Sequence, residues 1–288
     1  MDILPEETAT KAVESMVSSL DPDSKAKLDF TMTKSAFTTK VREAQVVQYK
    51  AAVAELMEYL HFCGVDTTKI EGSTSSFLEK VRFMQAAALG NWPANNHINN
   101  SFHKIVCEVG FNAGHSALLW LLAGATRVIS FELGQYNYSQ LAAGWLLDRF
   151  PGRLNVVLGD SFRTVPTFRT MFPHEVCDIV LVDGGHTTEA AWGDLVHLKE
   201  FVEVGSDAKN GHIVLVDDSH MPGVGAAWKQ AQEKGLVVED GQVESQYAEI
   251  NDVPFSVDLQ WNGQYVTESP EAINPPWAGN LAFGRYLL

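Results

Sequence analysis

The spacing of apolar residues predicts a helical first third of the chain. Between residues 38 and 65, apolar side chains recur every three to four positions, which is typical of an amphipathic helix, and Gly64 ends the pattern. The segments 5–20 and 75–91 show the same spacing and begin with acidic or serine residues that suit a helix start. Residues 1–100 are therefore expected to be mainly helical.

From residue 103 onward, short apolar runs alternate with helical patterns. The runs are rich in Val and Ile without strict polar alternation, which suits a parallel sheet covered by helices on both faces. Helices between parallel strands imply right-handed crossovers, so the expected fold is α/β and doubly wound. The expected strands are 104–109, 127–132, 154–159, 177–183 and 212–217, and the expected helices are 115–123, 136–149, 163–171, 187–203 and 223–234.

The pattern changes after residue 235. A strand is expected within 236–247, and DLQWNGQYV at 258–266 predicts a hairpin around an Asn-Gly turn. The proline-rich stretch 248–280 is interpreted as an insertion, and the apolar run 280–288 predicts a last strand.

The segment IVCEVGFNAGHS, residues 105–116, joins the first expected strand to a helix. Gly110 and Gly114 allow a tight turn that a ligand can approach, and the helix start beyond them offers unpaired N–H groups. The spacing departs from the G-x-G-x-x-G dinucleotide fingerprint. Glu108 would repel a pyrophosphate and attract an ammonium group. The turn therefore predicts a ligand with a positively charged amino end.

Acidic residues also follow the next two strands. Glu132 ends the second strand, where a carboxylate can accept hydrogen bonds from two ribose hydroxyls. Asp160 and Ser161 follow the third strand, and the alternative role for Asp160 is a helix N-cap. Ligands bind open α/β sheets at the carboxyl ends of the strands, so these residues are expected to face one site.

The fourth and fifth strands end in acids and histidines. Asp183 and His186 follow the fourth strand, and Asp217 and Asp218 follow the fifth. Asp oxygens suit a hard cation such as Mg²⁺, which could hold a substrate hydroxyl and lower its pKa. His186 could accept that proton, because the ordinary pKa of histidine is about 6.5. The alternative for the paired acids is a capped loop in which a buried Asp holds backbone N–H groups.

The E-x-G-x-x-x-G turn resembles motif I of the class I S-adenosylmethionine-dependent methyltransferases. The ends of strands four and five are similar to those of the metal-dependent macrocin-type and catechol-type small-molecule O-methyltransferases. Catechol-type enzymes, however, carry a lysine near the strand-four ligand, where this chain has Gly184, Gly185 and His186. The resemblance covers residues 103–235 and the final strand.

This resemblance implies a Rossmann-like methyltransferase domain over residues 101–288, with a mostly parallel sheet and an antiparallel last strand. It implies that residues 1–100 form a lid and substrate-binding region that also contributes to a homodimer. The cofactor would be S-adenosylmethionine, with Mg²⁺ beside it, and the acceptor would be the oxygen of a small molecule.

Carried over residue by residue, the resemblance implies His186 as the base, with Asp183 beside it in the catalytic pair. The metal ligands would be Asp183, Asp217 and Asp218. The cofactor contacts would be Glu108, Gly110, Asn112, Gly114, His115, Ser116, Glu132, Asp160, Ser161 and Asp183.

Other functions fit part of the pattern. Sulfur or nitrogen acceptors need little base or metal, and a thioether acid, as in sulfonium osmolyte synthesis, would need a cation for its carboxylate. A nicotinamide-dependent oxidoreductase would explain Glu132 but neither Glu108 nor the missing fingerprint. A binding module that only senses the cofactor would not need His186 and the paired acids. The candidate cations for an acceptor carboxylate are Arg42, Lys80, Arg82 and Arg285.

Composition narrows the partners and the location. The 288-residue chain has a formal net charge of −15 and no Lys/Arg cluster, which argues against nucleic-acid substrates. It shows neither an apolar run of membrane-spanning length nor a signal-peptide core, so a cytoplasmic protein without membrane contact is expected, with organelle delivery left open. Cys63, Cys107 and Cys177 lack metal-binding spacing. Cys107 and Cys177 are expected as small buried residues rather than as a redox pair.

Overall fold

The structure is a computed structural model that describes residues 34–70, 74–89, 104–202, 212–246, 259–261, 264–266 and 278–287. The chain divides into two compact units, Met1–Val47 and Gln48–Leu288. Helix α3 (Lys34–Phe62) crosses this boundary, and the site described below lies in the second unit. The helix predicted at 5–20 and most of the predicted insertion at 248–280 lie outside the described residues.

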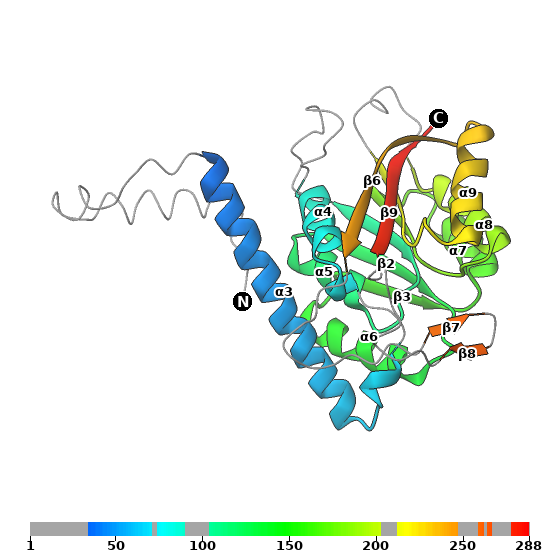
Figure 1. Ribbon diagram of the computed structural model, residues 1–288. Helices are drawn as coiled ribbons and strands as arrows, with labels where there is room; N and C mark the ends of the chain where they lie inside the picture. Colours follow the sequence, from blue (N-terminus) through cyan, green and yellow to red (C-terminus); the bar gives the residue numbers. More distant parts are fainter. Residues whose placement is uncertain are drawn as a thin grey trace. The chain divides into compact units, whose positions relative to one another are not determined.

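A seven-stranded sheet forms the centre of the second unit, in the order β3-β2-β1-β4-β5-β9-β6 (Figure 1). Strands β1 to β5 pair in parallel, and β9 pairs antiparallel with β5 and β6. The chain changes direction across the sheet between β1 and β4, which is where open α/β sheets bind ligands. The Rossmann-like fold with an antiparallel end is confirmed. The strands are β1 (Ile105–Val109), β2 (Arg127–Glu132), β3 (Leu154–Leu158), β4 (Ile179–Val182), β5 (Ile213–Val216), β6 (Val237–Gln246) and β9 (Ala278–Tyr286).

Helices cover both faces of this sheet (Figure 1). α7, α8 and α9 pack in series over a core that includes inward residues of β1, β4 and β5. α5 and α6 connect strands that step in the opposite direction, so right-handed crossovers place them on the other face, where α4 packs against α5 and β6. The helices are α4 (Leu78–Ala88), α5 (His115–Leu122), α6 (Asn137–Arg149), α7 (Ser161–Met171), α8 (Thr188–Lys199) and α9 (Pro222–Glu233), with 3₁₀ turns η1 (Thr67–Lys69) and η2 (Thr74–Ser76).

The long helix predicted at 38–65 is confirmed, and it begins earlier, at Lys34. Its part in the second unit buries one face, because Tyr49, Val53, Leu56 and Leu60 repeat at helical spacing and are all buried. Among the helices of the described residues, none has the length and apolar character that a membrane crossing needs.

The later strands also agree with the sequence pattern. β6 lies within the predicted 236–247 segment, and the predicted hairpin corresponds to the two-stranded sheet of β7 (Leu259–Trp261) and β8 (Gln264–Val266). The last strand, β9, begins two residues before the predicted start at residue 280.

Alternation along β1 sends its side chains into two different layers. Cys107 and Val109 belong to the core cluster under α7, α8 and α9. Glu108 points to the opposite face, where it accepts a hydrogen bond from Ser130 of β2. The acid predicted to meet a ligand therefore lies inside the α5 layer of the domain.

The two buried cysteines form a disulfide, which corrects the expectation that they stay unpaired. Cys107 lies on β1, and Cys177 lies just before the adjacent strand β4, with 5.8 Å between their Cα atoms. That separation is within the usual range for a disulfide. Parallel pairing of β1 with β4 brings together two residues that are 70 positions apart. Cys63 is free and exposed.

Thiol titration tests this pairing. With a thiol-reactive dye, denatured and unreduced protein should show one reactive thiol per chain, because Cys63 is the free cysteine of the structure. After reduction the count should rise to three, the number of cysteines in the chain. In Cys63→Ser the signal before reduction should vanish. Three reactive thiols in unreduced wild type would contradict the disulfide.

Candidate active site

The turn between β1 and α5 depends on glycine for a structural reason. Gly110 has a φ of +99°, and a Cβ atom there would collide with the backbone carbonyl oxygen of Asp183. The amide of Asp183 in turn donates to the carbonyl of Val109 at 2.9 Å. Gly110 therefore allows the ends of β1 and β4 to touch, and it brings the glycine turn against the first residue of the acidic loop.

Glu132 at the end of β2 holds this turn in shape. Its Oε2 accepts from the backbone N–H groups of Phe111 at 3.1 Å and Asn112 at 2.7 Å, and its Oε1 accepts from Gly134 at 2.9 Å. A carboxylate has about four acceptor positions, so these bonds leave about one for a further donor. The predicted contact of Glu132 with two ribose hydroxyls stays a prediction, and the geometry leaves room for one of them.

Glu108 is fully buried beneath the turn. Its Oε1 accepts from Ser130 Oγ at 2.7 Å. Burial raises the pKa of Glu108 to about 7, although hydrogen bonds from Ser130, Ser116 and Trp120 act in the opposite direction. The predicted contact between Glu108 and a ligand ammonium stays a prediction, and in the structure the carboxylate serves the packing of β1, β2 and α5.

The start of α5 is buried and, within the described part of the chain, has no side-chain cap. Gly114 is the N-cap residue, with a φ of +78°, and no side chain caps the helix among the described residues. The first N–H groups of an eight-residue helix can therefore bind a carboxylate. His115 lies at this start, and burial lowers its pKa to about 4, so its ring is neutral.

Tyr49 of α3 supports the same helix start. It is fully buried, and its hydroxyl donates to the carbonyl of His115 at 3.0 Å. Its apolar spacing in the long helix was the signal for a packing role.

Helix α8 contacts both the loop after β4 and the start of α7 through one buried acid, Asp194. Asp160 is exposed and caps α7, where its Oδ1 accepts from the amide of Phe162 at 3.0 Å. Asp194 of α8 is buried, and its side chain lies against Gly184 and interacts with Ser161. Burial raises the pKa of Asp194 to about 6. Sequence reasoning missed this acid because it sits in the middle of a helix.

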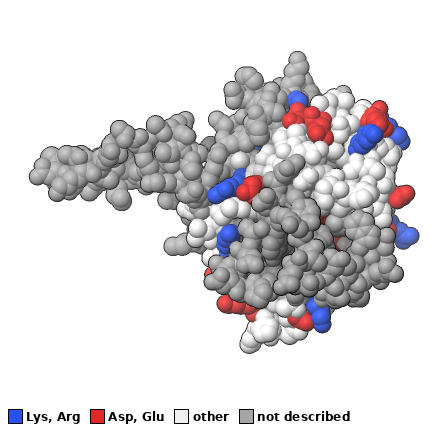
Figure 2. Space-filling model, in the orientation of Figure 1, with Lys and Arg blue, Asp and Glu red and all other residues white. Residues whose placement is uncertain are grey.

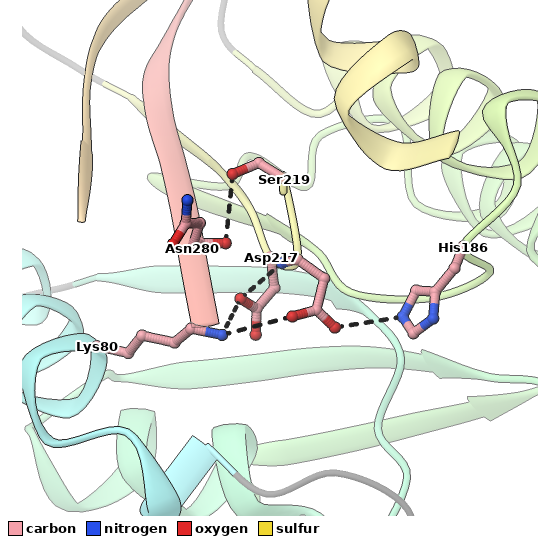
Figure 3. Close-up of polar contacts among 6 residues, drawn as sticks. Lys80, His186, Asp217, Ser219 and Asn280 are labelled. Atoms are coloured by element: carbon pink, nitrogen blue, oxygen red, sulfur yellow. Dashed lines mark hydrogen bonds and ion pairs between the residues drawn. The ribbon is translucent and has the colours of Figure 1, made fainter. Parts of the chain in front are cut away.

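The acids after β5 meet a lysine and a histidine (Figure 3). Lys80 of α4 donates to Asp217 Oδ1, and its Nζ lies 3.7 Å from Asp218 Oδ1. His186 lies on the far side, with its Nε2 at 3.6 Å from Asp218 Oδ2. Asp218 has a φ of +53°, which turns it away from the strand direction of Asp217. The structure therefore brings together both predicted acids, the predicted base, and a cation that the sequence assigned to another role.

Burial and mutual repulsion act on the protonation of this cluster. Burial and the charges of Asp217 and Asp218 raise the pKa of Asp183 well above its ordinary range. Burial, followed by the charge of Asp217, also raises the pKa of Asp218. For Lys80, burial alone would lower the pKa, but the charges of Asp217 and Asp218 outweigh it and raise the pKa.

The predicted Mg²⁺ ligands do not fit as a set. Asp217 Oδ1 is already engaged by Lys80 and by the amide of Asp218, which donates to it at 2.8 Å. The donor atoms that do converge belong to Asp183, His186 and Asp218, and they lie within 4.8 Å of one another. Mg²⁺ prefers oxygen ligands, whereas an imidazole in the set favours a transition metal. The all-aspartate magnesium site is therefore not supported by the geometry.

The predicted clamps for an acceptor carboxylate are also occupied or outside this cluster. Lys80 is buried against Asp217. Arg285 pairs with Asp240 of β6 through two contacts of 2.8 Å. Arg82 is exposed on α4, and the side chain of Arg42 lies outside the described residues. The proposed clamping role for Lys80 and Arg285 is therefore not supported.

Comparison with known proteins agrees with this fold. Residues 107–219 match the model of a methyltransferase domain family. No curated protein matches the chain. The chain is similar to the O-methyltransferase TomG from Streptomyces achromogenes in complex with S-adenosylmethionine, at 13% identity over 81% of this chain and 89% of that chain, with a TM-score of 0.50. It is also similar to an O-methyltransferase from Bacillus cereus in complex with S-adenosylhomocysteine, at 12% identity over 95% and 97% of the two chains, with a TM-score of 0.49.

The matched family segment runs from within β1 to the loop after β5, so it contains the glycine turn and the acids that end or follow β2, β3, β4 and β5. Together with the Rossmann-like sheet, this match indicates a methyltransferase domain in the part of the chain that holds the site.

The raised pKa of Glu108 gives a pH-dependent contribution to stability. The pKa of Glu108 is about 7 in the folded state and 4.5 ordinarily, so its protonated form stabilises the folded protein. This contribution to the free energy of unfolding is full below pH 4.5 and is lost as the pH rises through about 7. Glu108→Gln removes the penalty of ionisation. Relative to wild type, its free energy of unfolding should rise by up to about 3 kcal/mol between about pH 4 and pH 8.

Denaturant unfolding of the cofactor-free protein across this pH range measures the difference. Glu58→Gln, which changes an exposed glutamate of α3, is the matched control and should track wild type. A stability difference for Glu108→Gln that does not vary with pH would contradict the raised pKa.

Proposed function

We propose that this protein transfers a methyl group to a hydroxyl of a small-molecule acceptor, with His186 as the general base. The observation that carries the proposal is the pairing of His186 with Asp218 beside the glycine turn. The imidazole is about half exposed, so an acceptor can reach it, while Asp218 is mostly covered. S-adenosylmethionine supplies an electrophilic methyl group when bound.

Asp218 gives His186 a defined role in proton transfer. Its Oδ2 lies at ion-pair distance from Nε2, so the carboxylate stabilises the imidazolium that forms when the ring takes a proton. This arrangement leaves Nδ1 to receive the proton of the acceptor hydroxyl. Asp183 completes the group of donor atoms, and its backbone joins this loop to Gly110.

The turn offers suitable groups for the cofactor. The uncapped start of α5 would hold the carboxylate of the amino acid end, through the amides of His115 and Ser116. Glu132 has about one acceptor position left for a ribose hydroxyl. Asp160 and Ser161 follow β3, where the adenine end is expected, and Asp194 fixes Ser161 from below. These residues fit the group, and their contacts are part of the proposal.

Specific observations weigh against the alternative functions. Methylation of a thioether acid needs a free cation for the carboxylate, and Lys80 and Arg285 are both paired with acids. The match to a methyltransferase domain favours methyl transfer over a nicotinamide-dependent reaction. A metal-dependent version would use Asp183, His186 and Asp218 as ligands, and His186 could then not serve as the base.

The exclusion of nucleic acid, the oligomeric state and the location stay predictions. On the face shown in Figure 2, Lys and Arg of the described residues are interspersed with Asp and Glu, which supports an acceptor other than nucleic acid. The homodimer, the cytoplasmic location and the lid formed by residues 1–100 rest on the sequence alone.

Calorimetry with S-adenosylhomocysteine tests the cofactor assignment. Wild type should bind S-adenosylhomocysteine and give no heat with NAD. Glu132→Gln should weaken binding by about tenfold or more, because an amide cannot accept from all three turn N–H groups and a hydroxyl. Glu58→Gln should bind as wild type does. Tight binding of NAD in place of S-adenosylhomocysteine would overturn the assignment.

Removing the base tests the mechanism. His186→Gln should lower kcat by about 100-fold or more, with unchanged S-adenosylhomocysteine binding, because base catalysis contributes on that scale. The rate is measured as S-adenosylhomocysteine release with a panel of phenols, catechols and sugar hydroxyls. His220→Gln, which changes an exposed histidine near Asp218, is the control and should retain the wild-type rate. Full activity of His186→Gln with the best acceptor would rule out this base.

A further inference from the structure

We propose that the ammonium group of Lys80 is the resident cation of the acidic cluster at the ends of β4 and β5, in place of a divalent metal ion. Its consequence for catalysis rests on the proposed function, because Lys80 would position Asp218 for His186. Its consequence for metal binding does not depend on that function.

The position of Lys80 is built into the fold. The residue lies on α4 beside Val81 and Met84, and only 1% of its surface is exposed. Its Nζ contacts Asp217 Oδ1 and lies 4.5 Å from the centre of the Phe77 ring. A buried ammonium is strongly unfavourable unless acids compensate its charge. The helix that carries Lys80 is therefore tied to the end of β5, 137 residues later in the chain.

A divalent ion would compete with this ammonium for the same oxygens. Lys80 takes Asp217 Oδ1 and approaches Asp218 Oδ1 at 3.7 Å. A metal ion bound by Asp218 would thus lie within a few ångströms of a buried positive charge, where repulsion is weakly screened. The positive charge of Lys80 repels a metal ion. It also neutralises part of the negative charge of Asp217 and Asp218, which a metal ion would otherwise neutralise.

Asp218 lies between two partners, and this defines the indirect role of Lys80. Oδ1 faces the ammonium, and Oδ2 faces the imidazole of His186 (Figure 3). A carboxylate held at one oxygen has a fixed plane, so its second oxygen keeps a constant direction. Lys80 is therefore a positioning residue that acts on His186 through Asp218.

Lys104 provides a matched control on the same sheet. It is also buried, at 4% exposure, and it lies 4.0 Å from a single carboxylate oxygen of Asp178. The pair precedes β1 and β4, at the opposite ends of the strands from the cluster. Lys104→Met removes a buried lysine without freeing a group of acids.

Manganese binding is the direct test, measured by electron paramagnetic resonance and calorimetry on the full chain without acceptor. Wild type and Lys104→Met should show no saturable Mn²⁺ binding at the cluster. Lys80→Met should show saturable Mn²⁺ binding that wild type lacks, because the opposing charge is gone and the acids remain. Lys80→Arg keeps the charge and should behave as wild type does.

Activity measurements then test the positioning role. Wild-type turnover should be unchanged in EDTA. Lys80→Met should lower kcat with little change in the KM for S-adenosylmethionine, and Lys80→Arg should recover part of kcat. Absence of any methyl transfer would remove the proposed function and leave the manganese result to decide the role of the cation.

Two results would overturn the proposal. One is saturable Mn²⁺ binding by wild type that is lost in Asp218→Asn, and the other is wild-type turnover that EDTA abolishes and Mg²⁺ or Mn²⁺ restores. If Lys80→Met does not fold, as judged by circular dichroism, the wild-type manganese measurement and Lys80→Arg still decide between a resident ammonium and a metal.

Discussion

The backbone of Asp183 occupies the space where a side chain on residue 110 would be, and the arrangement of the whole site depends on this contact. It requires glycine at residue 110, with a left-handed φ. It also places the glycine turn after β1 directly against the acidic loop after β4. A wider gap between these two strand ends would separate the glycine turn and Glu132 from Asp183, His186 and Asp218. The switch point of the sheet is thus a physical contact as well as a feature of strand order.

The acids around this contact each have a partner within the protein. Glu132 holds the amides of the turn, Glu108 bonds to Ser130, and Asp160 caps α7. An acid buried or fixed in this way is pre-organised, because its orientation is set before any ligand arrives. The same bonds reduce its remaining capacity to accept hydrogen bonds. In Glu132 the bonds that hold the turn and the proposed ribose contact therefore draw on the same oxygens.

Compensation of charge is the second feature that shapes the site. Three aspartates converge near the ends of β4 and β5, and repulsion among them would be large without a cation. α4 brings Lys80 to them, and the loop after β4 brings His186. Protonation of part of the cluster and the ammonium of Lys80 act together to make its burial tolerable. This local balance leaves Asp218 between the ammonium of Lys80 and the imidazole of His186.

Local periodicity is enough to predict the sheet and its crossover helices, and the position of each residue within its element is enough to predict which acids stand at the strand ends. The sequence also placed the glycine turn, the strand-end acids and His186 at one edge. Tertiary structure alone decided which acids pair with which groups. The contacts of Lys80 with Asp217, Tyr49 with His115, and Cys107 with Cys177 join residues 137, 66 and 70 positions apart. Lys80 shares the buried face of α4 with Val81 and Met84, yet a lysine in a helix ordinarily faces solvent. Its burial depends on acids from a distant strand, and no local pattern reports which distant group a buried charge will meet.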